Sequence, residues 1–184
     1  MSDPFYQISG TALVSLLRSS DTVILAIDAL ATANSLNSRH CIEHLELTTS
    51  EDAQRLGKLG ILASVRPVRS DPHIPEAWPR YIGDDRCRRA FAYKELADYG
   101  AHVALGTDAP TVAHFPYPNL YNAPTRRSAI DTTLGAKTNE HSKVDLFSTM
   151  TTVTRGAAYS MWTEHRVGTI AVGKQADFVV AGLD

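Results

Sequence analysis

Cysteine, basic runs and long apolar stretches are all scarce in this sequence, and each scarcity excludes a class of protein. The two cysteines, Cys41 and Cys87, lack the close spacing of a metal-binding motif. We therefore expect free thiols in a reducing compartment, the cytoplasm. Basic residues form no long run, and the formal net charge is -2. We expect no nucleic-acid partner, because binding to phosphates needs clustered lysine and arginine.

No association with a membrane is expected. The longest apolar stretch, residues 22–31, contains Asp28 and is far too short to span a bilayer. The first residues hold no basic segment that leads into an apolar one, so we expect no signal peptide. The composition, with 43% hydrophobic and 21% charged residues, is typical of a soluble globular protein with one sizeable core.

Hydrophobic periodicity and turn residues predict that helices and strands alternate along the chain. The predicted helices cover residues 11–18, 22–36, 48–59, 93–99 and 143–162. The predicted strands cover residues 39–47, 61–65 and 103–105, with two further short strands around Gly173. Thr48 and Glu51 predict a capping box, and Gly60 predicts the end of that helix. Short joints between strands and helices are typical of right-handed parallel crossovers, so we expect an α/β fold with a parallel sheet.

Two segments with spaced prolines, residues 70–85 and 111–127, are predicted to be long loops without regular structure. Loops of this length inside a compact domain often carry function. The long helix that follows should bury one apolar face, which consists of Leu146, Met150, Val153, Ala157 and Met161.

Two residues suited to chemistry follow the ends of predicted strands. Asp108 comes after the buried run 103–105, and His44 lies near the end of the strand at 39–47. If both strands are parallel neighbours in one barrel, the two side chains point into the same mouth. There an imidazole and a carboxylate can share a divalent metal, and the carboxylate can take a proton from an attacking water.

Structural alternatives remain open for both residues. Asp108 could simply cap the turn that follows it, and His44 could be a core histidine bonded to the backbone. Glu43 alternates with His44, so we expect Glu43 to face the covering helices.

A series of motifs in the chain resembles one known family. The motifs are Arg39-His-Cys-Ile-Glu-His-Leu-Glu, Leu59-Gly-Ile-Leu-Ala-Ser-Val-Arg-Pro, Gly100-Ala-His-Val-Ala-Leu-Gly-Thr-Asp-Ala-Pro, Pro118-Asn-Leu-Tyr, Thr125-Arg-Arg-Ser, Gly156-Ala-Ala-Tyr and Gly168-Thr-Ile-Ala-Val-Gly-Lys-Gln-Ala-Asp-Phe-Val-Val. In this order, from about residue 21 to the end, they resemble the amidohydrolase superfamily. The nearest branch is the amidohydrolase-3 group, which includes the N-substituted formamide deformylases.

The resemblance implies a metal-dependent hydrolase of carbon–nitrogen (non-peptide) bonds such as amides, built on a (β/α)8 TIM barrel with a small β-sandwich. It places a metal-ligand histidine of the sixth strand at His44. It places the aspartate of the eighth strand, metal ligand and general base, at Asp108. The implied cofactor is a divalent metal, zinc before others, and the implied partner is a small-molecule amide substrate.

The sequence departs from this family at the positions that would complete the metal site. It has no His-x-His pair, no histidine in residues 17–21, no lysine at the bridging position, and Arg69 where relatives often have a histidine. A complete barrel needs about 250 residues, and the chain has 184. We therefore expect a partial barrel of about strands six to eight at residues 21–165, return strands of the sandwich at 166–184 and an unassigned segment at 1–20.

These departures leave a second function open. The chain would then be a non-catalytic truncated remnant, or a half-barrel that needs a homo-oligomer or a complementing chain. Weaker candidates for substrate contact are His73, His114 and Tyr121, for which an ordinary loop role is an alternative. Arg126 and Arg127 could bind an anion, but adjacent arginines more often form a solvated face.

Overall fold

The fold is described from a computed structural model that covers residues 12–14, 24, 27–29, 31–32 and 39–180. Its centre is a sheet of four strands in the order β1-β2-β3-β4. The strands are β1 (Ala12–Val14), β2 (Cys41–His44), β3 (Leu62–Val65) and β4 (Val103–Leu105). All three neighbouring pairs are parallel, which confirms the predicted α/β class and parallel sheet.

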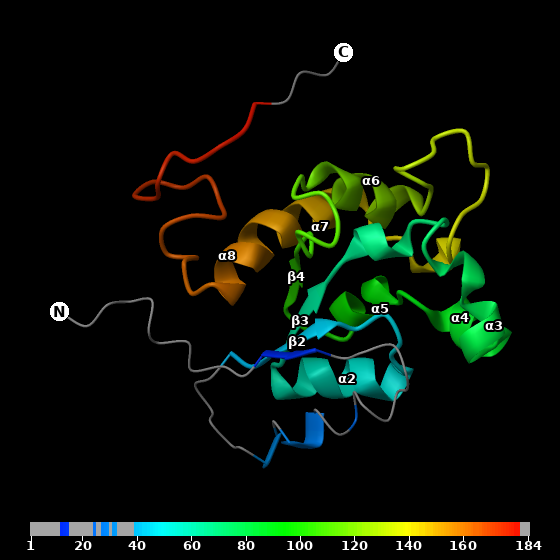
Figure 1. The fold of residues 1–184 in the computed structure, drawn as a ribbon. Coiled ribbons are helices and arrows are strands. Elements are labelled where there is room, and N and C mark those ends of the chain that lie inside the picture. Colours follow the sequence, from blue (N-terminus) through cyan, green and yellow to red (C-terminus); the bar gives the residue numbers. More distant parts are fainter. Residues whose placement is uncertain (1–11, 15–23, 25–26, 30, 33–38, 181–184) are drawn as a thin grey trace.

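Short helices connect and follow these strands (Figure 1). The α-helices are α2 (Ser50–Leu59), α3 (Pro79–Ile82), α4 (Asp84–Arg89), α5 (Tyr93–Asp98), α6 (Tyr117–Thr125), α7 (Leu146–Thr151) and α8 (Ala157–Ser160). The 3-10 helices are η2 (Pro67–Ser70), η3 (Pro75–Ala77) and η4 (Glu140–Ser142), and a π-helical turn, η5 (Thr152–Gly156), joins α7 to α8. None of the helices in the described ranges has the length and apolarity needed to cross a membrane.

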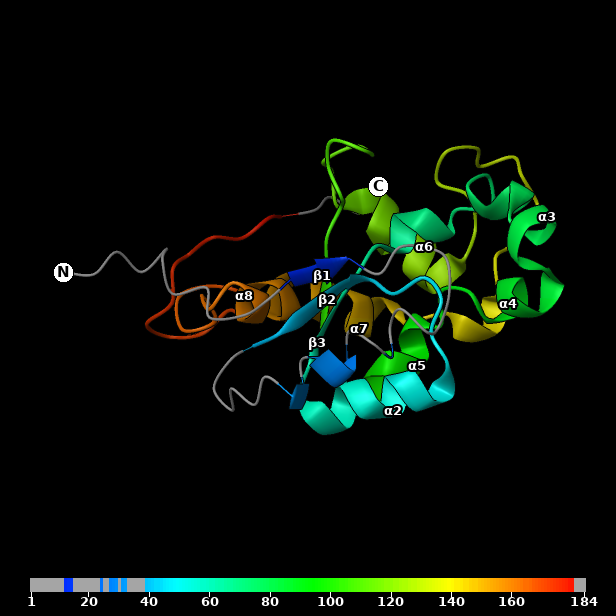
Figure 2. The ribbon, with the colours of Figure 1, turned by 60° about the horizontal axis from the view of Figure 1, so that its bottom comes forward.

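The hydrophobic core lies between the sheet and helices α2 and α5, which share one side of it (Figure 2). On the sheet, Ile42 pairs in register with Ala63, and both are fully buried. They pack in one cluster with Leu56 of α2 and Leu96 of α5, which are also fully buried. Burying each of the larger side chains, Ile42, Leu56 and Leu96, contributes about 1.5–3 kcal/mol. Packing on this side of the sheet therefore stabilises the fold.

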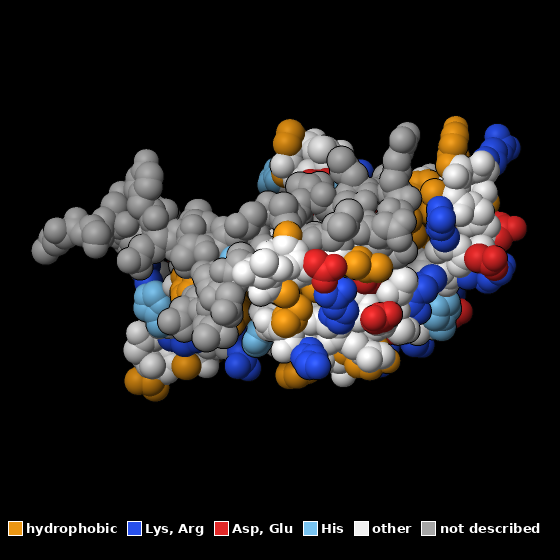
Figure 3. Space-filling model, turned by 90° about the horizontal axis from the view of Figure 1, so that it is seen from below, with side chains coloured by type: hydrophobic (Ala, Val, Ile, Leu, Met, Phe, Trp, Pro, Cys, Tyr) orange, Lys and Arg blue, Asp and Glu red, His pale blue; other side chains and the backbone are white. Residues whose placement is uncertain are grey.

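The outer surface of α2 faces solvent. Seen from that side, basic and acidic side chains are interspersed, with hydrophobic side chains among them (Figure 3). Arg55 of α2 forms an ion pair with Asp28 there. Helix α2 is therefore amphipathic, with one face in the core and the other in water.

The boundaries of α2 show a one-residue error in the sequence prediction. The capping box is made by Thr49 and Asp52, not by Thr48 and Glu51. Thr49 Oγ1 accepts a hydrogen bond from Asp52 N at 3.1 Å, and Thr49 N donates to Asp52 Oδ2 at 2.8 Å. Two adjacent threonines are followed by two adjacent acids, so the sequence offers both registers. The predicted end at Gly60 is confirmed, with φ 65° in the left-handed region that glycine favours.

The prediction of a helix at residues 11–18 is wrong for its described part. Residues Ala12–Val14 form β1, in which Leu13 pairs with Ile42 of β2. A three-residue apolar run fits a strand as well as a helical turn, and pairing with β2 decides between them. In the predicted helix at 22–36, the described residues are helical and Ile27 is fully buried. Val23 and Leu30 of its predicted apolar stripe lie outside the described residues, and Ala31 is exposed.

Short helices also form inside the two proline-spaced segments, which corrects the prediction of irregular loops. Helices η3, α3 and part of α4 lie in the first segment, and α6 lies in the second. Pro75 and Pro79 begin η3 and α3, and Pro118 is the second residue of α6. Proline is tolerated in the first turn of a helix, where its missing N–H would have no partner. These three prolines therefore mark helix starts.

The long helix predicted at residues 143–162 forms over residues 146–160, and its predicted buried face is only partly correct, since Val153 packs against the core. Thr149 and Ala158 are buried, whereas three predicted core residues are exposed, namely Leu146, Met150 and Met161. At Gly156 the helix lies so close to β4 that a Cβ atom would overlap the carbonyl oxygen of Val103. Small residues thus determine which face approaches the sheet, and the π-helical turn shifts the periodicity between α7 and α8.

The two strands predicted around Gly173 are absent, since residues 163–180 contain neither helix nor strand. The apolar residues of this segment, including Ile170, Val172 and Phe178, are exposed. A strand needs a partner for its backbone groups, and this segment pairs with no described strand.

Candidate functional site

The two residues that the sequence singled out lie together at the carboxyl end of the sheet. His44 is the last residue of β2, and Asp108 follows β4. The Nε2 atom of His44 lies 3.9 Å from Oδ1 of Asp108. The prediction that these side chains share one mouth is therefore confirmed, and the roles of the two residues remain predictions.

The backbone turns sharply at both positions. His44 has φ 74°, Leu45 has φ 58° and Asp108 has φ 65°, all in the left-handed region that non-glycine residues seldom adopt. Such conformations cluster where the surrounding structure holds a side chain in place for function. Because of this turn, the side chain of His44 does not follow the alternation of the strand. It lies beside Asp108 instead.

The prediction that Glu43 faces the covering helices is wrong, because it assumed that His44 follows the alternation of the strand. It is Ile42 that packs in the core beneath the helices. Glu43 accepts a hydrogen bond from Cys41 Sγ at 3.6 Å and forms an ion pair with Arg66. Arg66 also donates to Ser64 Oγ at 2.7 Å. Alternate residues of β2 and β3 therefore give the sheet face opposite the core a polar lining.

Glu46 orients the imidazole of His44, and the sequence analysis missed it. Glu46 is 5% exposed, and its Oε1 lies 2.9 Å from His44 Nδ1. The hydrogen bond to Glu46 raises the pKa of His44 above its usual 6.5, which outweighs the opposing effect of burial. When Nδ1 carries the hydrogen that Glu46 accepts, Nε2 faces Asp108, with a lone pair in the neutral ring and a hydrogen in the charged ring. A histidine that binds a metal through one ring nitrogen typically donates the hydrogen of the other to a carboxylate. An acidic residue two positions after His44 was the signal in the sequence that could have predicted this pair.

Arg69 occupies the other oxygen of Asp108. Its guanidinium forms an ion pair with Oδ2 of Asp108. Thr111 Oγ1 donates to the same oxygen at 2.7 Å, and Arg69 Nη2 donates to Thr111 Oγ1 at 2.7 Å. Burial raises the pKa of Asp108, but the hydrogen bonds from Arg69 and Thr111 outweigh it and the net pKa is lowered. Asp108 is therefore ionised at neutral pH. Its carboxylate binds Arg69 and Thr111, so it does more than cap the turn that follows it.

The described residues supply only part of a site for a divalent metal. His44 and Asp108 are the right donor types for zinc, but three or four ligands are usual. Across the described residues, no group of three or more histidine, cysteine, aspartate or glutamate side chains could hold a metal ion. The positive charge of Arg69 on Asp108 further opposes a bound cation. The described residues alone therefore do not fit the metal that the family resemblance implies.

The loop that carries Arg69 is fixed by a buried aspartate. Asp71 is fully buried, and it accepts hydrogen bonds from Ser128 Oγ at 2.8 Å and from Ala129 N at 2.7 Å. Asn122 of α6 also donates to Asp71 at 3.3 Å. These bonds join η2 to the segment after α6, so the two proline-spaced segments meet beside the mouth.

The weaker candidates have partners of their own. His73 lies 3.7 Å from Asp131, and the ring of His114 lies 4.0 Å from that of Phe115. Tyr121 of α6 is 37% exposed. Their predicted contact with substrate stays a prediction.

Arg126 departs from the predicted solvated face, because it is fully buried while Arg127 is exposed. Its Nε donates to Thr138 O at 2.7 Å. Its Nη1 is buried without a hydrogen-bond partner, and burial lowers the pKa of Arg126 to about 10.

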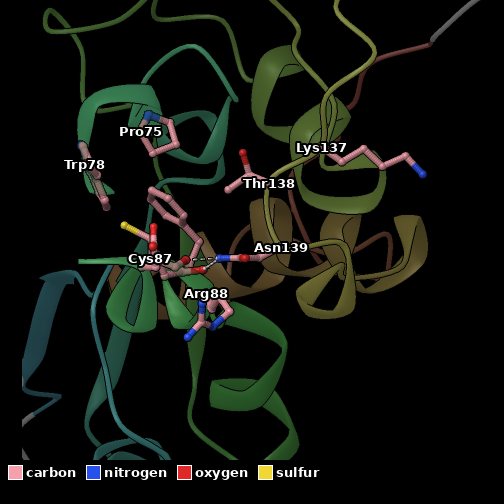
Figure 4. A pocket seen from close by; sticks show the side chains of 10 residues that line it. Pro75, Trp78, Cys87, Arg88, Lys137, Thr138 and Asn139 are labelled. Carbon is pink, nitrogen blue, oxygen red and sulfur yellow. Dashed lines mark hydrogen bonds between the residues drawn. The ribbon is translucent and has the colours of Figure 1, made fainter. Parts of the chain in front are cut away.

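Two pockets lie beside these loops. One, of about 250 Å³, is lined by Val68, Ile74, Val112, Ala113, Phe115, Pro118, Asn119, Ala129 and Ile130. The other, of about 290 Å³, lies between α4 and residues 137–139 (Figure 4). There the Asn139 side chain donates to Cys87 O at 2.7 Å and to Ala90 O at 2.8 Å. Both amide hydrogens of Asn139 are thereby used within the fold.

Comparison with known proteins agrees with this fold. A metal-dependent hydrolase from Pyrococcus furiosus superposes with a TM-score of 0.73, at 20% identity, over 91% of this chain and 32% of its own. This likeness shows that the two chains share a fold over that length. The sequence profile of the amidohydrolase family matches residues 16–182, and the chain belongs to that family.

Two curated relatives are similar to most of the chain. YtcJ of Bacillus subtilis is 30% identical over 149 residues, which are 80% of this chain and 28% of YtcJ. The imidazolonepropionase of Alkaliphilus metalliredigens is 26% identical over 138 residues, 75% of this chain and 27% of that enzyme. The chain thus spans less than a third of the length of the relatives that it matches.

Proposed function

We propose that this chain contributes a hydrolytic site for carbon–nitrogen bonds other than peptide bonds, in amides such as N-substituted formamides. The observation that carries the proposal is the 3.9 Å approach of His44 Nε2 to Asp108 Oδ1 at the carboxyl end of the sheet. Asp108 is ionised at neutral pH, so it can accept a proton from an attacking water. Glu46 keeps His44 facing that carboxylate. Membership of the amidohydrolase family supports a hydrolase that uses a divalent metal.

In this proposal the sheet is part of a (β/α)8 barrel. The sequential order of four parallel strands supports it, because consecutive strands are neighbours in such a barrel. Strands β2, β3 and β4 would then be the sixth to eighth strands, and β1 would precede them. Residues 166–184 would belong to the accompanying β-sandwich.

In a complete site the metal would be zinc, which would make a water bound to it more acidic. His44 and Asp108 would be two of its ligands. The remaining ligands would have to come from outside the described residues, since these hold no complete set.

A second candidate function is supported by Arg69. Its ion pair with Asp108 places an internal cation beside the carboxylate where a metal would bind. In this alternative, the chain is a non-catalytic half-barrel that pairs with a second copy or with a complementing chain.

The two candidates are separated by measuring metal content and amide hydrolysis on the purified protein. The first candidate predicts zinc in the purified protein and hydrolysis of N-benzylformamide, with Asp108→Asn lowering kcat about 100-fold or more, and the second predicts neither. His102→Gln serves as the control, since His102 stacks on Tyr159 and not on the site. A wild-type protein without zinc and without hydrolysis contradicts the first candidate. The solution mass then divides the second, because a stable monomer without metal supports a truncated remnant and a tight complex supports a half-barrel that needs a partner.

A further inference from the structure

We propose that the 250 Å³ pocket beside Asp108 binds an apolar substituent of the substrate, which consists of one ring or of two fused rings. This inference rests on the proposed function, because it assigns the substrate class of the same site. The pocket forms where the segment after β3 meets the segment after β4. In parallel sheets, ligands bind outside the carboxyl ends of the strands, and this pocket lies among the loops at that end.

The pocket adjoins the carboxylate through its own walls. Val68 precedes Arg69 and Val112 follows Thr111. Arg69 and Thr111 both contact Oδ2 of Asp108. In this proposal, a substrate whose reactive bond lies at Asp108 directs the group attached to that bond toward the pocket.

The chemistry of the walls selects an apolar group. Asn119 is the single polar side chain among the described residues that line the pocket. Its Oδ1 accepts from Val68 N at 2.7 Å, and its Nδ2 donates to Gly106 O at 3.0 Å. Both ends of the amide are thus used within the fold. A polar ligand group would lose its water and gain no partner from Asn119, which costs free energy.

The volume suggests the size of the group. An apolar cavity of about 150 Å³ holds one benzene ring. A pocket of about 250 Å³ therefore accepts a phenyl group with its linker, or a naphthyl group. Phe115, which is 54% exposed, offers a ring at the rim against which a second ring can pack.

A series of primary amides tests the proposal, with acetamide, phenylacetamide and 2-naphthylacetamide as the probes. Binding is measured by calorimetry on the wild-type protein and on Asp108→Asn. We expect phenylacetamide to bind roughly thirtyfold more tightly than acetamide, as burial of a ring predicts, and 2-naphthylacetamide to bind at least as tightly. The same preference in Asp108→Asn would support the pocket even if the protein hydrolyses nothing. Equal affinities for acetamide and phenylacetamide would overturn it.

Two pairs of variants locate the binding. Ala129→Phe fills the pocket and should abolish the preference for a ring, whereas Ala77→Phe, at an exposed residue of η3, should keep it. Phe115→Ala should weaken phenylacetamide binding several-fold, and Phe147→Ala, on the exposed face of α7, should not. Melting temperatures verify that each variant folds. If Ala129→Phe does not fold, the phenylalanine pair decides, and an unchanged ring preference in Phe115→Ala refutes the assignment.

Discussion

The guanidinium of Arg69 pairs with one oxygen of Asp108, Oδ2, while Nε2 of His44 faces the other, Oδ1, at 3.9 Å. Two cationic or potentially cationic groups thus share one carboxylate. A divalent cation at this place would compete with Arg69 for Asp108. The charge balance at the mouth therefore depends on a residue that stands where family members often carry a histidine.

Replacing Arg69 tests that competition. We expect Arg69→His to raise the affinity for zinc about tenfold or more, a change within the range seen when groups around metal ligands are altered, because it removes a fixed positive charge and adds a third donor. Titration of the metal-free protein with zinc, followed by calorimetry, measures the change. Arg80→His, at an exposed residue of α3, is the control for a histidine placed elsewhere. Equal affinities of the two variants would show that Arg69 does not govern metal binding.

Arg126 and Arg127 form a matched pair of neighbours with opposite environments. Arg126→Ala should lower the free energy of unfolding by about 2 kcal/mol, because it opens a cavity and leaves the carbonyl of Thr138 without its donor. Arg127→Ala should change it by less than about 0.5 kcal/mol, as is usual for exposed residues. Urea unfolding measures both. Arg126→Met keeps most of the volume without the buried charge, and we expect it to be the milder change at that position.

Gly57 is required by a close backbone contact, and Gly135 is not. A Cβ at Gly57 of α2 would overlap the carbonyl of Tyr99, and nothing lies within 4 Å of the Cβ position at Gly135. Gly57→Ala should therefore cost about 2 kcal/mol or more, since α2 must move away from the segment after α5. Gly135→Ala should be neutral or stabilising by up to about 1 kcal/mol. Thermal unfolding followed by circular dichroism compares them, and similar melting temperatures would contradict the observed packing.

Acid should weaken the link between the start of β2 and the end of α8. Arg39 forms an ion pair with Glu164, and its guanidinium lies 3.7 Å from the ring centre of Tyr159. The hydrogen bond from Arg39 lowers the pKa of Glu164 below its usual 4.5, against the effect of burial. The unfolded state therefore binds this proton first, so the contribution of Glu164 to stability is present above about pH 4.5 and is lost as the pH falls through the lower folded pKa.

The Glu164→Gln variant tests this dependence. Urea unfolding at pH 7 and at pH 3.5 should show a smaller loss of stability for Glu164→Gln than for the wild type. Glu76→Gln, an exposed residue of η3, should behave like the wild type. Parallel acid profiles for all three proteins would exclude a role for the Arg39–Glu164 pair.

Local signals in the sequence were sufficient for much of the fold. Gly60 predicts the end of α2 because its left-handed conformation is a property of the residue itself. The strands around Ile42 and Ala104 follow from short apolar runs between turn residues. Such reasoning could not predict that Leu146 and Met150 are exposed, because their spacing is that of the buried face of a helix. Only the contact of Gly156 with β4 determines which side of the helix meets the sheet.

The sequence by itself determined the class of the fold, the strands β2, β3 and β4, and the placement of His44 and Asp108 at the ends of parallel strands. These features depend on short-range periodicity and on turn residues, which act within a few positions. The tertiary structure alone decided that Glu46 orients His44, that Arg69 binds Asp108, that Arg126 is buried and that residues 12–14 join the sheet. Except for Glu46, which lies two residues from His44, each of these depends on contacts between residues distant in the chain, and such contacts exist only once the strands have paired in register.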